Sequence, residues 1–296
     1  MVSMERLNVL AIGAHPDDCE IRVGGTAARF AEAGHRVKFV AVTEGSAGHH
    51  ITSGPETALR RRGEAAEAGR RLGIAEVEVL PLADGYLEPT MANRLEIIRI
   101  IRQWKADIVI THRPNDYHAD HRYTSVLVQD AAYLVLVPRV CPQVEVLRAN
   151  PVFFYMEDAF QKPVRFTPSI VVDVAPSWQK KIAGLDAHAS QFYEWLPWVG
   201  GEKLGGGAPK KPSVDGSLAG GVPTVDGATI PTDPAARIAW LDARFRSAPV
   251  QDSVRRAFEA RYPNHPAGTP ILAEAFELCE YGRQPSAAEL DDLFPR

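Results

Sequence analysis

The sequence has few cysteines, and their spacing forms no recognisable pattern. Cys19, Cys141 and Cys279 are odd in number, lie far apart and include no Cys-x-x-Cys motif. They therefore predict neither a disulfide framework nor a thiolate zinc cluster. The N-terminus also lacks the basic segment, apolar stretch and small-residue cleavage site of a signal peptide. We therefore expect a protein of the reducing cytoplasm.

Long apolar runs and an excess of positive charge are also missing. No apolar run approaches the ~18 residues that a membrane-spanning helix needs, so no membrane span is expected. The formal net charge of -4 argues against a nucleic-acid partner, because phosphate binding requires a basic surface. The 296 residues, 45% of them hydrophobic and 24% charged, indicate a globular protein with a substantial core.

Strand and helix patterns alternate along the first two thirds of the chain. Short, mostly apolar segments predict strands at 7–13, 36–42, 76–82, 107–111, 152–155 and 169–174. Helical patterns lie between or after them, at 24–34, 57–73, 91–104, 119–137 and 176–192. This alternation predicts an α/β fold, with a Rossmann-like, mostly parallel sheet and helices on both faces.

The composition changes at Trp195. Residues 195–233 are rich in glycine and proline, which indicates an insertion or a lid. Trp195 and Trp198 at its start could stack on a sugar or seal a subunit interface. Helices are expected again at 234–262 and 270–281. The predicted organisation is a catalytic domain over 1–194, an insertion over 195–233, and a C-terminal helical extension of the same domain over 234–296.

Two polar clusters follow predicted strands. Ala14-His15-Pro16-Asp17-Asp18 comes directly after the first strand, and Asn115 to His121 follows the strand at 107–111. In open parallel sheets, ligands bind at the carboxyl ends of the strands. A single histidine or aspartate there would more often be an ordinary loop residue or a helix cap. Two such clusters at equivalent strand ends instead favour a metal site.

The first cluster has the chemistry of a hydrolytic zinc site. Two imidazoles and one carboxylate bind Zn²⁺ and leave a position open for water. The ion then lowers the pKa of that water and polarises a substrate carbonyl. If His15 and Asp18 coordinate the ion, Asp17 can act as general base, a role worth roughly 10² to 10⁴ in rate.

The second cluster offers the remaining groups. His118 and His121 are three residues apart at a predicted helix start and therefore share one face. One of them can be the third ligand, while the other stands beside the open position as an acid or an oxyanion donor. Asp120 can orient an imidazole through its second ring nitrogen.

These motifs resemble those of the PIG-L or LmbE-like de-N-acetylases. That family carries Ala-His-Pro-Asp-Asp-x-Glu, then Gly-Gly-Thr, then His-x-Asp-His, which stand here at 14–20, 24–26 and 118–121. The resemblance covers roughly residues 5 to 195 and implies a zinc hydrolase that removes an acyl group, usually acetyl, from an amino sugar or its conjugate. By position, it implies the metal ligands His15, Asp18 and His121, the base Asp17, and His118 as acid or oxyanion stabiliser.

The resemblance also implies roles for residues outside the two clusters. His188 lies in Ala187-His188-Ala189-Ser190-Gln191, which matches a family helix except for a one-residue shift of the alanine, and would reach the site from its other side. Arg61 and Asp84 fall where the family holds sugar hydroxyls, although a neighbouring arginine could take the place of Arg61. Arg22 departs from the family, because a small residue usually precedes Gly-Gly.

Two other functions fit part of the sequence. His15, Asp17 and a distant histidine could form the triad of a non-haem Fe(II) enzyme, although such sites usually lie in all-β barrels. A non-catalytic Rossmann-like module could bind phosphate at Gly24-Gly25, but Gly-x-Gly-x-x-Gly is missing and the second cluster would stay unexplained.

The preferred prediction is a zinc-dependent N-deacetylase that cleaves a linear amide in a small N-acetylated sugar or conjugate. Family members often form homo-oligomers, and the apolar segment 133–140 is one place where an interface could form. The identity of the sugar and of the acyl group stays open at this point.

Overall fold

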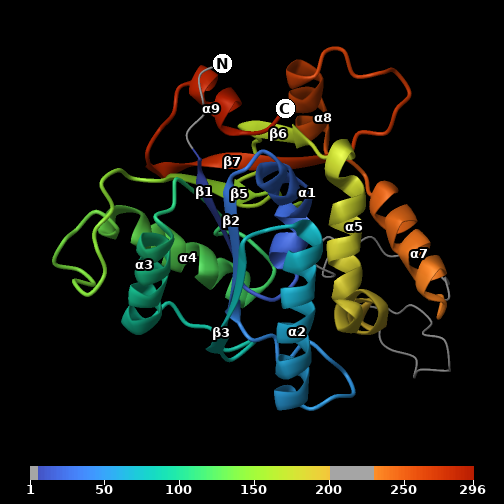
Figure 1. Cartoon of the computed structure of the whole chain (residues 1–296), viewed down its shortest axis with the longest axis horizontal. Coiled ribbons are helices and arrows are strands. Elements are labelled where there is room, and N and C mark those ends of the chain that lie inside the picture. Colours follow the sequence, from blue (N-terminus) through green and yellow to red (C-terminus); the bar gives the residue numbers. More distant parts are fainter. Residues whose placement is uncertain (1–5, 201–229) are drawn as a thin grey trace.

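The computed structural model describes residues 6–200 and 230–296 (Figure 1). Within these residues, seven strands form one sheet in the order β3-β2-β1-β4-β5-β7-β6. All pair in parallel except β7, which is antiparallel to both of its neighbours. The strands are β1 (Asn8–Gly13), β2 (Arg36–Thr43), β3 (Glu76–Leu82), β4 (Ile108–Thr111), β5 (Val152–Met156), β6 (Ile170–Asp173) and β7 (Ala273–Gly282).

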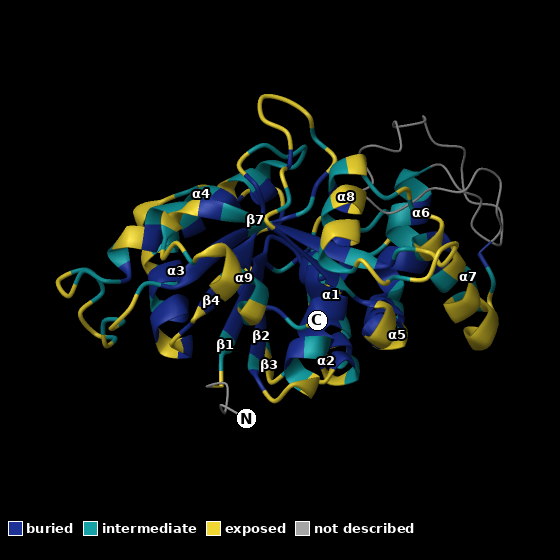
Figure 2. Ribbon diagram, turned by 90° about the horizontal axis from the view of Figure 1, so that it is seen from above, coloured by how far each residue is buried: buried dark blue, intermediate teal, exposed yellow. Residues whose placement is uncertain are grey.

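Helices cover both faces of the sheet. One face carries α1 (Asp18–Glu32), α2 (Gly54–Leu72) and α5 (Trp178–Ala187), and the other carries α3 (Met91–Trp104) and α4 (Ala119–Leu134). In β1, Val9 and Ala11 pack in the first of these two cores, whereas Leu10 and Ile12 pack in the second. Figure 2 shows the buried sheet between the helices. The predicted α/β class, with a mostly parallel sheet covered on both faces, is confirmed.

The C-terminal region contributes to the sheet as well as to its cover. Helix α7 (Pro234–Arg246) contacts α5, α8 (Asp252–Arg261) contacts β6, and α9 (Ala287–Leu293) follows β7. The predicted helix at 270–281 is wrong, because this segment forms β7. Its alanine, glutamate and leucine residues favour a helix locally. Strands β5 and β6, however, supply hydrogen-bond partners on both of its sides, so tertiary pairing overrides the local preference.

Two other predicted helices are interrupted. The segment 176–192 contains a 3₁₀ turn, η1 (Ala175–Ser177), and α5, which ends before His188. A π-helical turn, η2 (Gln191–Trp195), and the short helix α6 (Leu196–Val199) follow. The segment 234–262 is split between α7 and α8, around Pro249. Most of the predicted insertion, 201–229, lies outside the described residues.

The strand order reverses at β1. The chain runs outward from β1 through β2 to β3 and then crosses back to place β4 on the other side of β1. The carboxyl ends of β1 and β4 therefore flank a topological switch point, where α/β sheets bind ligands. Both polar clusters follow these two strand ends. In the described part of the chain, none of the helices has the length and apolar character required to cross a bilayer.

Candidate active site

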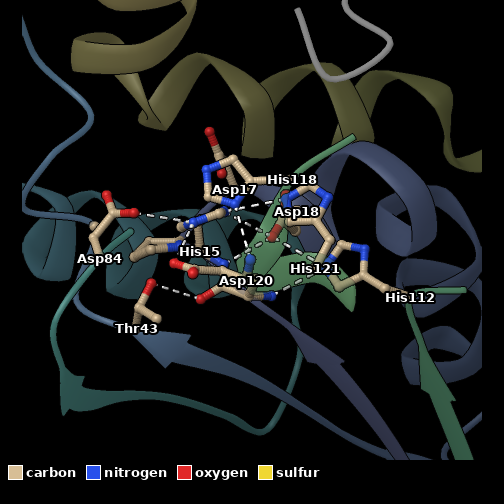
Figure 3. A network of polar contacts seen from close by, with 12 residues as sticks. His15, Asp17, Asp18, Thr43, Asp84, His112, His118, Asp120 and His121 are labelled. Carbon is tan, nitrogen blue, oxygen red and sulfur yellow. Dashed lines mark hydrogen bonds and ion pairs between the residues drawn. The ribbon is translucent and has the colours of Figure 1, made fainter. Parts of the chain in front are cut away.

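The side chains of three potential ligand residues meet between the loops that follow β1 and β4 (Figure 3). His15 Nδ1 lies 3.4 Å from Asp18 Oδ2 and 3.2 Å from His121 Nε2, and His121 Nε2 lies 3.4 Å from Asp18 Oδ1. Ligands that surround Zn²⁺ tetrahedrally at about 2.0–2.1 Å are separated from one another by about 3.3 Å. The distance between the two imidazole nitrogens, and the distance from each of them to one of the two Asp18 oxygens, therefore fit the edges of a tetrahedral site.

The second nitrogen of each imidazole faces a carboxylate. His15 Nε2 is 3.1 Å from Asp84 Oδ1 and 3.4 Å from Asp120 Oδ2, and His121 Nδ1 is 3.1 Å from Asp116 Oδ1. Metal-binding histidines usually have such a partner, which fixes the ring and its tautomer. The other two nitrogens, His15 Nδ1 and His121 Nε2, face each other, as two ligands of one ion would.

His112 also belongs to the cluster, although no sequence motif predicts a role for it. Its ring stacks on His121 with centroids 4.0 Å apart, and its Nε2 lies 3.2 Å from Asp18 Oδ2 and accepts a hydrogen bond from Ala14 N. His112 directly follows β4, as the His15 loop follows β1, and this strand-end position was the signal that could have identified it. Other metal-capable groups in the described residues are His15 with His118 and His121, Asp18 with His112 and His121, and His15 with Asp84 and Asp120.

The cluster contains more negative than permanent positive charge. Burial would raise the pKa of Asp18, but the charges of His121 and His112 outweigh it and hold this pKa well below its usual value. Burial would lower the pKa of His15, but hydrogen bonds to three carboxylates raise it well above its usual value. A divalent cation would offset this charge. The buried carboxylates are Asp17, Asp18, Asp84, Asp116 and Asp120, and Arg61 is the buried guanidinium among them.

Asp17 is held in an unusual conformation beside the ligand atoms. Its φ of 133° lies in a region that side-chain-bearing residues rarely adopt, and such strain is found mainly at functional sites. Arg61 Nη2 donates to Asp17 Oδ1 at 3.1 Å and to the Pro16 carbonyl at 2.6 Å. Burial raises the pKa of Asp17 to about 6, although the Arg61 charge opposes this. A pKa near neutrality suits a general base.

His118 is positioned to donate a hydrogen bond. It precedes α4, and its Nδ1 accepts a hydrogen bond from Asp120 N at 3.1 Å, so Nε2 carries the proton in the neutral ring. Burial, followed by the charges of His15 and His121, lowers the pKa of His118 to about 4. His118 and Asp17 both line a cleft of about 290 Å³, and His15, Asp18 and His121 line it with them.

Arg61 and Asp84, expected to contact the substrate, also line this cleft. Arg61 is almost fully buried and also donates to the Gly45 carbonyl at 3.1 Å. A Cβ at Gly45 would lie 2.5 Å from Arg61 Nη1, so this close approach requires glycine. Asp84 Oδ2 accepts a hydrogen bond from Ala47 N at 3.1 Å. Burial alone would raise the pKa of Asp84. The hydrogen bond to His15 outweighs burial, so this pKa is lowered to about 2.

His188 lies in the interior next to Asp17. It is fully buried at the end of α5, with Nε2 3.2 Å from Glu20 Oε1. Burial would lower the pKa of His188, but the carboxylates of Glu20 and Asp17 raise it. Its charge in turn lowers the pKa of Asp17. The structure thus brings His188 to the buried side of the site.

The two tryptophans of the predicted insertion stack at the rim of the cleft. The rings of Trp195 and Trp198 have centroids 5.2 Å apart, and His50 stacks on Trp198 at 4.6 Å. Trp195 lines the cleft. Glu194 fixes this segment to the loop after β2, because it lies 2.9 Å from His49 Nε2 and pairs with Arg60. An aromatic wall therefore borders the cleft.

One family model and several known proteins match this chain. The family model described as PIG-L, GlcNAc-PI de-N-acetylase, matches residues 10–132. The chain is 31% identical over 197 residues to the diacetylchitobiose deacetylase of Thermococcus kodakarensis, an alignment that covers 64% of this chain and 73% of the relative. It is 26% identical over 196 residues to the 4-oxalmesaconate hydratase of Pseudomonas putida, which covers 64% of this chain and 75% of the relative.

A solved structure extends the likeness in fold to the C-terminal region. The 4-carboxy-2-hydroxymuconate hydratase GalB from Pseudomonas putida KT2440 superimposes with a TM-score of 0.65 and 18% identity. The match covers 94% of this chain and 98% of that one. At this identity, the likeness concerns the fold alone.

Proposed function

The chain belongs to the PIG-L (LmbE-like) family of deacetylases, and we propose that it is a zinc-dependent hydrolase that removes an N-acetyl or other N-acyl group from an amino sugar or its conjugate. One observation carries this proposal: Asp17 and His118 line the same cleft as the three ligand atoms of His15, Asp18 and His121. The relative that is named a diacetylchitobiose deacetylase supports an amino-sugar substrate.

The proposed zinc ligands are His15 through Nδ1, Asp18 through its carboxylate and His121 through Nε2. Two nitrogens and one oxygen form the donor set of many catalytic zinc sites. Zinc bound there would lower the pKa of a water molecule and polarise the carbonyl of the scissile amide. In this proposal Asp84 and Asp120 orient the ring of His15, and Asp116 orients the ring of His121. The Nε2 atom of His112 contacts the Asp18 carboxylate and supports it.

Asp17 is proposed to accept a proton from the water that attacks the amide carbon. Arg61 holds Oδ1 of Asp17, so Oδ2 is the oxygen assigned to this proton. The carboxylate is kept rigid by the guanidinium and by the turn at Pro16. Its raised pKa makes it a stronger base than an exposed aspartate, and His188 moderates this pKa from the buried side.

His118 is proposed to stabilise the oxygen of the tetrahedral intermediate. Its lowered pKa keeps the ring neutral near pH 7, so Nε2–H donates a hydrogen bond instead of releasing a proton. Collapse of the intermediate then breaks the carbon–nitrogen bond, and the proton held by Asp17 passes to the leaving amine. The products are a carboxylate and the amino sugar in its ammonium form, because the proton of the new carboxylic acid passes to the amine. Contact of Arg61 and Asp84 with sugar hydroxyls remains a prediction.

A second candidate function is the addition of water to a carbon–carbon double bond. The relative that is named a 4-oxalmesaconate hydratase favours it. The charges near the site support amide hydrolysis better, because an acidic substrate would need arginines to receive it. Arg61 is paired with Asp17, and Arg113 is paired with Asp158 at 2.9 Å and with Glu277 at 3.1 Å.

The test compares the parent protein with Asp17→Asn for bound zinc and for release of acetate from N-acetylated glucosamine derivatives. We expect near-stoichiometric zinc in both proteins and a loss of about 10² to 10⁴ in kcat for the variant, because the base is removed while the ligands remain. Asp130→Asn is the matched control, since Asp130 pairs with Arg94 on the surface of α4 and should leave the rate unchanged.

Two outcomes would contradict the proposal. Full activity of Asp17→Asn would exclude Asp17 as the base. A zinc-loaded parent that hydrates unsaturated dicarboxylates and releases no acetate would establish the second candidate instead.

A further inference from the structure

A second pocket adjoins the proposed zinc site at the end of the cluster where His112 lies. We call it the side pocket; it has a volume of about 190 Å³ and shares Asp18, Ile21, Tyr117 and His121 with the catalytic cleft. Figure 3 shows His112 at one end of the cluster and Asp84 at the other. We propose that the side pocket binds the acyl group of the substrate, and that the group it fits is uncharged and larger than acetyl. This inference rests on the proposed hydrolase function.

The position of the side pocket matches the acyl side of an amide. Asp17 and His118 line the catalytic cleft, whereas Asp18 and His121 line both spaces. A carbonyl at the shared wall would therefore meet the zinc ligands, the base and the oxyanion donor together. The amine portion would remain in the cleft beside Asp84 and the aromatic wall, and the acyl chain would pass Tyr117 into the side pocket.

Apolar and aromatic side chains form much of the lining. Ile21 of α1 and Met156 at the end of β5 are almost fully buried there. The ring of Tyr117 lies 6.0 Å from that of Phe160 and 5.4 Å from that of His121. Such surfaces suit a hydrocarbon chain or ring, because apolar burial supplies the binding free energy.

The charged groups around the side pocket are paired with protein groups. Arg113 Nη1 donates to both carboxylate oxygens of Asp158, at 2.9 and 3.1 Å. Glu157 Oε1 accepts a hydrogen bond from Gln251 at 2.7 Å. Because these charged groups already have partners within the protein, an uncharged acyl group is the best fit. The carboxylates along the pocket are Asp18, Asp116, Glu157 and Asp158, and the guanidinium groups are Arg22 and Arg113.

The volume exceeds what acetyl requires. An apolar cavity of about 150 Å³ can hold benzene. A pocket of about 190 Å³ therefore has room for a ring of that size or a comparable alkyl chain, whereas the methyl group of acetyl would leave most of it unfilled.

The experiment measures kcat/KM for amine release by the zinc-loaded protein from glucosamine carrying N-acetyl, N-butanoyl, N-hexanoyl or N-succinyl groups. Each fully buried methylene should raise kcat/KM by about fourfold, so N-hexanoyl should exceed N-acetyl by tenfold or more once two of its additional methylenes are buried. N-Succinyl, which carries a charge, should show no such gain. Equal or lower rates for the longer uncharged groups would overturn the inference while the hydrolase proposal stood. Amine release from none of the four would count against the hydrolase proposal itself.

Ala159→Trp tests the location of the acyl group. Ala159 is exposed and lines the side pocket, so a larger side chain there can occupy the pocket without entering the core. We expect the ratio of N-hexanoyl to N-acetyl kcat/KM to fall at least fivefold, whereas the matched variant Ala159→Ser should keep the parental ratio. Turnover of the N-acetyl substrate by both variants shows that they are folded. An unchanged ratio in Ala159→Trp would place the acyl group elsewhere.

Discussion

Two regions of the protein bury carboxylates but compensate their charge in different ways. One region lies at the loops after β1 and β4, and the other lies between α1 and β7. Around His15, five carboxylates gather near one guanidinium. Between α1 and β7, Glu274 faces Lys181 with 2.7 Å between Oε1 and Nζ, so one negative charge meets one positive charge. The first cluster has the charge of a cation site, and the second has that of a structural pair.

The structural pair also satisfies backbone groups of α1. Glu274 accepts hydrogen bonds from Gly25 N at 2.9 Å and Thr26 N at 2.7 Å, and Lys181 donates to the Ile21 carbonyl at 2.8 Å. A Cβ on Gly25 would lie 2.6 Å from Val174 Cβ, so glycine is required for this approach. The Gly-Gly-Thr motif therefore connects the helix that carries Asp18 to the sheet. Burial alone therefore does not distinguish a candidate cation site from a structural pair, whereas uncompensated charge does.

Removal of zinc should have the largest effect on activity and stability, because the protein itself leaves the charge of this cluster uncompensated. A chelator should abolish amide hydrolysis, and readdition of zinc should restore it. Zinc at about 1,000 times its Kd should stabilise the folded protein by about 4 kcal/mol, measured as an increase in Tm. Asp18→Ala should lose this response, because a ligand is missing, whereas Asp130→Ala should keep it. An equal increase in Tm in Asp18→Ala would show that the ion binds elsewhere.

Disruption of the balanced pair should affect stability strongly. Lys181→Met leaves Glu274 buried without its cation and should reduce the free energy of unfolding by about 3–5 kcal/mol, measured by urea denaturation. Lys180→Met is the matched control next to it. Lys180 pairs with Glu32 at the surface, where both side chains are 45% exposed, so its loss should cost about 0–1 kcal/mol. Equal losses of unfolding free energy in the two variants would show that Glu274 does not depend on Lys181 for charge compensation.

Replacement of Glu157, a buried carboxylate that belongs to neither group, should have the smallest effect on stability. Burial raises the pKa of Glu157, so the folded state favours the protonated form. The cost of ionising this group is present above its folded pKa and disappears as the pH falls below the unfolded value of 4.5. Glu157→Gln should therefore raise Tm at pH 7 by at most about 2–4 °C. This difference should vanish near pH 4 in thermal melts, and a difference independent of pH would show that it does not arise from ionisation of Glu157.

Much of the sheet and of the candidate site could be predicted from the sequence, because the signals are local. The apolar run before His15 reflects a strand covered on both faces, and the strand before His112 shows the same pattern. Two clusters at equivalent strand ends then implied proximity without any knowledge of strand order. In the structure, His15 Nδ1 and His121 Nε2 are 3.2 Å apart, although 106 positions separate the two residues.

The C-terminal region could not be predicted in the same way. Residues 273–278 have helix-forming composition, and the free edges of β5 and β6 that turn them into a strand exist only in the folded chain. Glu274 likewise has no sequence motif, since its partners lie 248 and 249 positions away on α1 and 93 away on α5. The contribution of His112 depends on its ring stacking on His121, which composition does not encode.

The sequence by itself determined the α/β class, the two polar clusters and the family, because periodicity and short motifs are properties of neighbouring residues. Only the tertiary structure decided which atoms face one another: the separation of His15 Nδ1, Asp18 and His121 Nε2, the hold of Arg61 on Asp17, and the side pocket beyond Tyr117. The physical reason is that charge compensation, pKa and pocket volume depend on groups brought together from distant parts of the chain, and packing fixes those distances.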